Sequence, residues 1–238
     1  MRFYYRVFVA ILVSISLNVY SADIEFTHPT LHMRERIDLN TKEFWQEKTL
    51  NHWERIGKID FGDTDLRELP TPFACQVFPK GSHYWISISG TGQLYDFDPV
   101  ALTFRRIDKT YFRGYNFGAL QFVRQDTLFS FGGLGFWHYN NIETYFSPAL
   151  KEWERVPIYL QGPGRILANF SGLTKAQDKL FVLELPDYFV QKPVDIQELK
   201  LFTFDFTKKS WEILGWVSYK NLQGAGMQSL EAIFIQNM

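Results

Sequence analysis

Short apolar runs alternate with turn-forming and charged residues along most of the chain, a pattern that predicts β-strands joined by tight turns. The middle of the sequence shows it most clearly. Its apolar runs are "FGALQFV" (117–123), "TLFSF" (127–131), "IETYF" (142–146) and "WERVPI" (153–158). Comparable sets of four runs precede and follow this one, from "FACQVF" to "TFRRI" and from "ILANFSG" to "SWEIL". The pattern therefore predicts an all-β fold built from units of four consecutive antiparallel strands.

These units also repeat in sequence. Four segments align without gaps: 43–56, 94–107, 143–156 and 201–214. One column of the alignment is aromatic throughout and holds Trp53, Phe104, Trp153 and Trp211, at spacings of 51, 49 and 58 residues. This period is too long for helical hairpin repeats and fits a four-stranded propeller blade.

The middle unit resembles the kelch repeat. Gly132 and Gly133 close its second strand, Tyr145 follows about twelve residues on, and Trp153 about twenty. The resemblance implies that each repeat is one blade of a β-propeller, in which the glycines permit a close-packed exit from the second strand and the large aromatics wedge between blades. Other repeats depart from the pattern: Ser89-Gly90 and Glu184-Leu185 replace the double glycine, and Phe104 replaces tryptophan. A β-sandwich or another meander remains the alternative.

The expected domain, a kelch-like β-propeller, spans residues 22–238. Its repeats are expected at about 24–57, 73–108, 115–158 and 166–214, with a partial repeat at 224–238. We expect three complete four-stranded blades and a partial blade at each end. The stretch "DIEFTHPTLHMRERI" is poorly patterned for strands, so the first repeat is predicted to contribute only a third and a fourth strand. We therefore also expect the chain to be the N-terminal part of a longer propeller, forming an open arc.

Residues 1–21 have the features of a secretory signal peptide. Arg2 and Arg6 precede the apolar run "VFVAILVSISL", and Val19 and Ser21 supply small residues before a cut between Ser21 and Ala22. An uncleaved membrane anchor is the alternative, although the run is short of the roughly 20 residues that a span needs. Cys75 is the only cysteine, which excludes an internal disulfide. We expect a secreted, periplasmic or cell-surface protein with no stable transmembrane span in its mature form.

Composition excludes several classes of function. The chain has 25 Lys and Arg against 26 Asp and Glu, without a long run of either sign, so nucleic acid is not an expected partner. The five histidines show no metal-ligand spacing, and no nucleophile elbow, phosphate-binding loop or zinc-protease motif occurs. We accordingly predict no metal, no cofactor and no catalytic residue.

Aromatic and polar residues gather in loops that a meander would place at one end. These loops connect the second and third strands or join successive blades, whereas the opposite loops, such as "SPALKE" and "FTKKS", indicate a charged, inert surface. Flat rings beside polar groups suit recognition of a sugar or a peptide. The candidate ligand-binding residues are Trp137, His138, Tyr139, Tyr188, Tyr111, Arg113 and Arg165.

Two classes of function follow. The first is a non-catalytic exported recognition module that binds a protein or a glycan, as part of a larger surface or sensor protein. The second is a carbohydrate enzyme similar to kelch-type sugar epimerases, for which the candidate loops offer only Glu184, Asp187 and Asp195 as acidic groups. The enzyme hypothesis depends on fold analogy alone.

Overall fold

The computed structural model describes residues 23–64, 75–110, 116–135, 138–158, 162–166, 171–174, 179–184 and 198–218. Within these residues the chain is all-β, with no helix and with four separate antiparallel sheets of four strands each. In every sheet, consecutive strands are neighbours, so each sheet is a simple meander.

The first sheet contains β1 (Asp23–Thr27), β2 (Arg34–Asp38), β3 (Glu43–Thr49) and β4 (His52–Lys58). The second contains β5 (Cys75–Lys80), β6 (His83–Ile88), β7 (Leu94–Asp98) and β8 (Thr103–Arg106). The third contains β9 (Leu120–Arg124), β10 (Thr127–Gly135), β11 (His138–Ser147) and β12 (Glu152–Arg155). The fourth contains β13 (Ser171–Thr174), β14 (Lys179–Leu183), β15 (Glu198–Asp205) and β16 (Ser210–Ser218).

The prediction of a partial first unit is wrong, because the stretch that looked poorly patterned forms β1 and β2 and completes the first sheet. Along β2, Glu35 and Ile37 are buried against the second sheet, while Arg34 and Arg36 lie on the opposite face. A strand that is polar on one face and carries a buried glutamate on the other lacks the apolar alternation on which strand prediction depends. The predicted partial repeat at 224–238 lies outside the described residues.

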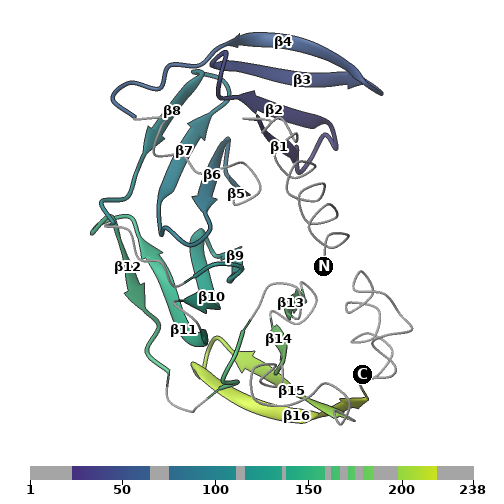
Figure 1. Ribbon diagram of the computed structural model, residues 1–238, viewed down its shortest axis with the longest axis vertical. Coiled ribbons are helices and arrows are strands. Elements are labelled where there is room, and N and C mark those ends of the chain that lie inside the picture. The colour runs from purple at the N-terminus through teal and green to yellow at the C-terminus, as the bar shows by residue number, and fades with distance from the viewer. Residues whose placement is uncertain are drawn as a thin grey trace, which may run out of the picture.

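The four sheets follow one another around an arc in sequence order (Figure 1). The first strand of each sheet (β1, β5, β9 and β13) lies on the inner side of the arc, and the fourth strand (β4, β8, β12 and β16) lies on the outer side (Figure 1). Neighbouring sheets therefore meet face to face, and the core is divided among the spaces between them.

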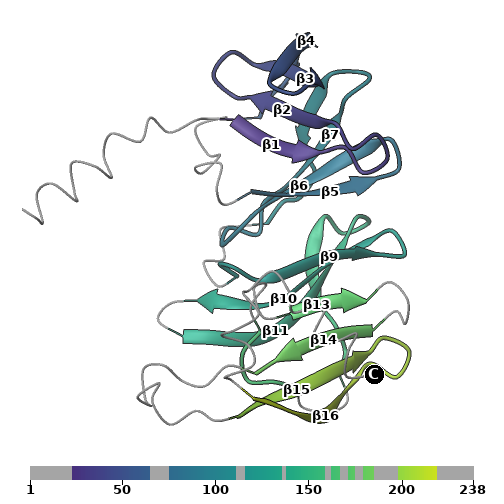
Figure 2. The same ribbon diagram turned by 90° about the vertical axis from the view of Figure 1, so that its right-hand side faces the viewer.

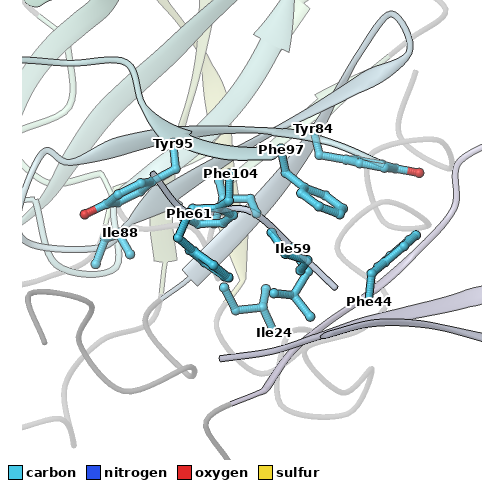
Figure 3. Packing of buried hydrophobic residues seen from close by; sticks show 11 residues of the cluster. Ile24, Phe44, Ile59, Phe61, Tyr84, Ile88, Tyr95, Phe97 and Phe104 are labelled. Atoms are coloured by element: carbon cyan, nitrogen blue, oxygen red, sulfur yellow. The ribbon is translucent and has the colours of Figure 1, made fainter. Parts of the chain in front are cut away.

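Three hydrophobic clusters fill these spaces. The cluster between the first and second sheets joins Ile24 and Phe44 to Tyr84, Phe97 and Phe104 (Figure 3). A second cluster joins the second sheet to the third, and another joins the third to the fourth. The pleat alternation directs the two sides of each inner sheet into different clusters.

Three residues of the aromatic column pack between successive sheets. Phe104 is fully buried against the first sheet, Trp153 is buried against the second, and Trp211 against the third. Each of these residues thus packs on the sheet that precedes its own. Trp53 has no preceding sheet among the described residues and is only half-buried.

The outer face of the first sheet is polar where the other sheets are apolar. Glu47 pairs in register with Trp53, at the position that Phe97, Phe146 and Phe204 occupy beside their own column residues. Arg34 forms ion pairs with Glu25 and Glu47, and Arg36 lies over the ring of Trp53 at 4.7 Å. Cation–π contacts and ion pairs thus replace the apolar packing of an inter-sheet face.

The double glycine allows two inter-sheet connections to approach β10. Gly132 has a φ of +69°, and a Cβ there would lie 2.4 Å from the carbonyl oxygen of Ile166. Gly133 has a φ of +105°, and a Cβ there would lie 2.8 Å from the Cα of Asn116. Both positions therefore require glycine for conformation and for space.

Gly132→Ala is expected to lower the free energy of unfolding by about 2–4 kcal/mol, because both a left-handed conformation and a backbone contact oppose the new methyl group. Gly81→Ala is the matched control, since Gly81 has a φ of +62° but nothing lies within 4 Å of the position that its new methyl group would take. The control should lose about 1 kcal/mol from backbone strain alone. Urea unfolding measures both, and equal losses would contradict the packing role of Gly132.

Candidate functional site

The meander sorts its loops into two ends. The segments that join second to third strands, and those that join one sheet to the next, emerge together, and we call this the connection end. The segments that join first to second and third to fourth strands form the hairpin-tip end, which lies along the right-hand side of Figure 2. Binding residues commonly lie on loops that a rigid scaffold positions, so both ends are candidates.

At the connection end, the segment 162–166 is bonded onto the β10–β11 hairpin. The backbone N–H of Gly133 donates to the carbonyl of Ile166 at 2.8 Å, and the N–H of Ile166 donates to the carbonyl of Asn140 at 3.4 Å. The Asn140 side chain donates to the carbonyl of Gly133 at 3.1 Å and accepts from the N–H of Ile142 at 2.9 Å. This network fixes the hairpin and the inter-sheet connection as one unit.

Three of the seven predicted ligand-binding residues belong to this unit. His138 and Tyr139 are the first residues of β11 and pair with Gly135 and Leu134 of β10. Arg165 precedes Ile166 in the bonded connection and is partly buried. The backbone therefore brings the Tyr139 region and Arg165 together, although they are distant in sequence. Trp137, Tyr188, Tyr111 and Arg113 lie outside the described residues.

The sequence predicts a loop at 134–140, and the structure differs. After an irregularity between Phe131 and Gly133, the ladder resumes and continues to the Gly135–His138 pair. The bulge comes from the double glycine, which shifts the register without ending the strands. His138 and Tyr139 therefore lie on a hairpin, which is a more rigid support than a loop.

Glu184 of the fourth sheet holds the segment 162–166 at the same end of the fold. Its carboxylate accepts a hydrogen bond from the N–H of Gly164 at 2.8 Å and lies 3.6 Å from the ammonium group of Lys200. Gly162 packs on Trp211, because a Cβ at this glycine would lie 2.4 Å from the indole ring. The carboxylate of Glu184 is therefore engaged in holding the connection. Asp187 and Asp195 lie outside the described residues.

Phe117 is an aromatic residue of this end that the sequence pattern predicts to lie in a strand. It forms an isolated bridge with Leu134 and is 44% exposed. Its ring covers Gly90, where a Cβ would lie 2.0 Å from the ring, and the N–H of the following Gly118 donates to Ser89 at 3.0 Å. In the sequence, Gly118 indicates that the strand begins after it, and β9 begins at Leu120.

The described residues offer little reactive chemistry. They contain no group of three or more His, Cys, Asp or Glu side chains that could hold a metal ion. Burial raises the pKa of the Cys75 thiol to about 11, so this cysteine is protonated near neutral pH.

No family model matches this chain, and no curated protein matches it either. Among the described residues, no helix has both the length and the apolar character needed to cross a membrane.

Proposed function

We propose that the protein is an exported recognition module with a kelch-like β-propeller architecture, and that it binds a protein or a glycan at the connection end. The repeat of four-stranded meanders, the inner position of each first strand and the aromatic wedge between sheets support the propeller. Export depends on the features of residues 1–21, with a mature chain that begins near Ala22.

The observation that carries the binding proposal is the hydrogen-bonded unit of 162–166 with the β10–β11 hairpin. It fixes the backbone of Tyr139, His138 and Arg165 on two elements that are bonded to each other, so little backbone order is lost when a ligand binds. Phe117 adds a partly exposed ring at the same end, over Gly90 of the second sheet's β6–β7 connection. Aromatic rings suit the apolar faces of a glycan or peptide, and a guanidinium group suits its hydroxyl or carboxylate groups.

No observation among the described residues favours the sugar-epimerase alternative. Glu184 is the only one of its three acidic candidates that the structure describes, and its carboxylate holds the backbone of Gly164. A carboxylate with that structural role is a poor general acid or base, because moving a proton would disturb the contact.

A glycan and peptide array with the purified protein tests the proposal. Arg165→Ala and Tyr139→Ala are expected to weaken binding of any ligand found by roughly tenfold or more, as expected for central polar and aromatic contacts. Lys151→Ala, at the hairpin-tip end, is the control and should leave that affinity unchanged. Binding that responds to Lys151 and not to Arg165 or Tyr139 would move the site to the other end of the fold.

A further inference from the structure

The strands β14 and β15 are buried on both faces, although among the described residues no sheet follows the fourth one. One face packs on the third sheet through Leu180, Val182, Phe202 and Phe204. The residues that alternate with these point to the opposite side. Four of them are at most 3% exposed: Phe181, Leu183, Leu199 and Thr203. We call this side of β14 and β15 the far face, and its burial requires a cover.

The far face repeats the surface by which earlier sheets contact the next one. One position on the second strand of a sheet pairs in register with the residue just before Phe97, Phe146 or Phe204. In the second, third and fourth sheets this position holds Trp85, Phe129 and Phe181. Trp85 packs in the cluster shared with the third sheet, and Phe129 packs against the cluster shared with the fourth. By the same repeat, Phe181 faces the unit that would come next.

The spacing of the sheets along the chain identifies a segment that can supply this unit. Each later sheet begins a fixed interval after the fourth strand of the sheet before it: 17 residues from Lys58 to Cys75, 14 from Arg106 to Leu120, and 16 from Arg155 to Ser171. Applied to Ser218, the last residue of β16, an interval of 14 to 17 residues predicts a strand that begins between residues 232 and 235. The sequence there is "AIFIQNM" (232–238), which opens with four apolar residues.

The extent of the burial favours a single inner strand as the cover. First strands lie on the inner side of the arc (Figure 1), and β5 and β9 contact each other where the second sheet meets the third. On the far side of the fourth sheet, Thr203 is buried but Glu212, its partner on the outer strand β16, is exposed. A complete sheet or a second copy of the chain would also cover β16. We propose that residues 232–238 form a further first strand that packs on the far face.

Thiol labelling of the full chain tests the cover, in a Cys75→Ser background. Leu183→Cys reports on the far face, and Val182→Cys, on the adjacent residue that faces the third sheet, is the matched control. Phe234→Asp and Ile235→Asp each place a charge in the segment, and only one of the two can face β14, because neighbouring side chains of a strand alternate. We expect one of them to speed maleimide labelling of Leu183→Cys by roughly tenfold or more, with Val182→Cys unchanged. Labelling of Leu183→Cys that neither substitution speeds would overturn the proposal.

Disulfide cross-linking detects the contact itself and needs no destabilising charge. In the same background, Leu183→Cys is combined in turn with Ile233→Cys, Phe234→Cys or Ile235→Cys, and each protein is oxidised. We expect a disulfide within one chain for at least one of the three pairs, because a disulfide requires the two residues to lie close together. None is expected when Val182→Cys takes the place of Leu183→Cys. A disulfide only between two chains would assign the far face to a second copy, and no disulfide would assign its cover to another segment. Either result would overturn the proposal.

Discussion

Trp153→Ala is expected to lower the free energy of unfolding by about 3–5 kcal/mol, the usual cost of deleting a large buried aromatic side chain. Trp153 is 6% exposed and packs with Phe146 and Trp85 between the second and third sheets. Its indole N–H donates to the carbonyl oxygen of Gly92 at 2.7 Å, so the substitution also removes a buried hydrogen bond between sheets. Urea unfolding followed by circular dichroism measures the loss.

Trp53→Ala is the matched control from the same column of the repeat. Trp53 is half-buried on the outer face of the first sheet, where Arg34 and Arg36 lie over its ring. Its loss should cost about 1 kcal/mol, because the surrounding side chains remain partly hydrated. If the two variants lost equal stability, the column would not distinguish an inter-sheet wedge from a surface aromatic.

The contrast between these two tryptophans shows what the repeat pattern could predict. The strands of the middle unit and the aromatic column follow from local patterning, because a wedge residue and its turn recur at a fixed interval in the chain. The sequence could not show that the face bearing Trp53 is polar. Glu47, Arg34 and Arg36 occupy positions that are apolar in other sheets, and their ion pairs depend on a fold that had first to be known.

The polar residues on the outer face of the first sheet explain how this sheet can end the stack. Stacked repeats need a terminal unit whose outer face tolerates water. The outer face of this sheet meets the requirement through ion pairs of Arg34, Arg36 and Arg55 with carboxylates on neighbouring strands. A sheet capped in this way does not need another apolar sheet against it, which is consistent with the arc of sheets in Figure 1.

The candidate site was only partly accessible from the sequence. The pattern identified Tyr139 and Arg165 as members of loops at one end, but the proximity of their backbones depends on Ile166, which accepts a hydrogen bond from Gly133 of β10 and donates one to Asn140 of β11. At the hairpin tips, the lysines of "SPALKE" and "FTKKS" indicate only a charged surface. The exposure of Leu50, Val100 and Leu150 follows from turn geometry, which composition does not reveal.

Lowering the pH should strengthen the junction between the third and fourth sheets. There the Trp211 indole N–H donates to the carboxylate of Glu143 at 3.1 Å, whereas the equivalent bond of Trp153 goes to a neutral backbone carbonyl. Burial raises the pKa of Glu143 from 4.5 to about 7, and the Trp211 hydrogen bond and the charge of Arg155 on β12 offset only part of that effect. The junction thus contains a carboxylate that is costly to ionise.

The sign of the effect follows from proton linkage. Between pH 4.5 and about 7 the folded protein holds a proton on Glu143 that the unfolded chain has released, so stability falls as the pH rises through this range. The loss should be on the order of 3 kcal/mol and should level off above the folded pKa. Urea unfolding at about pH 5 and about pH 8 measures it.

Glu143→Gln keeps an acceptor for the Trp211 indole but cannot ionise, so its unfolding free energy should lack most of this pH dependence. The contribution of His83 to the pH dependence must be measured separately. Its bond to Asp96 raises the pKa of the imidazole, and the stability that this bond adds is also lost as the pH rises through the folded pKa. His83→Gln removes the histidine contribution and should retain the Glu143 slope between pH 4.5 and about 7. A slope that survives Glu143→Gln and disappears with His83→Gln would assign the pH response to the second sheet and not to the junction.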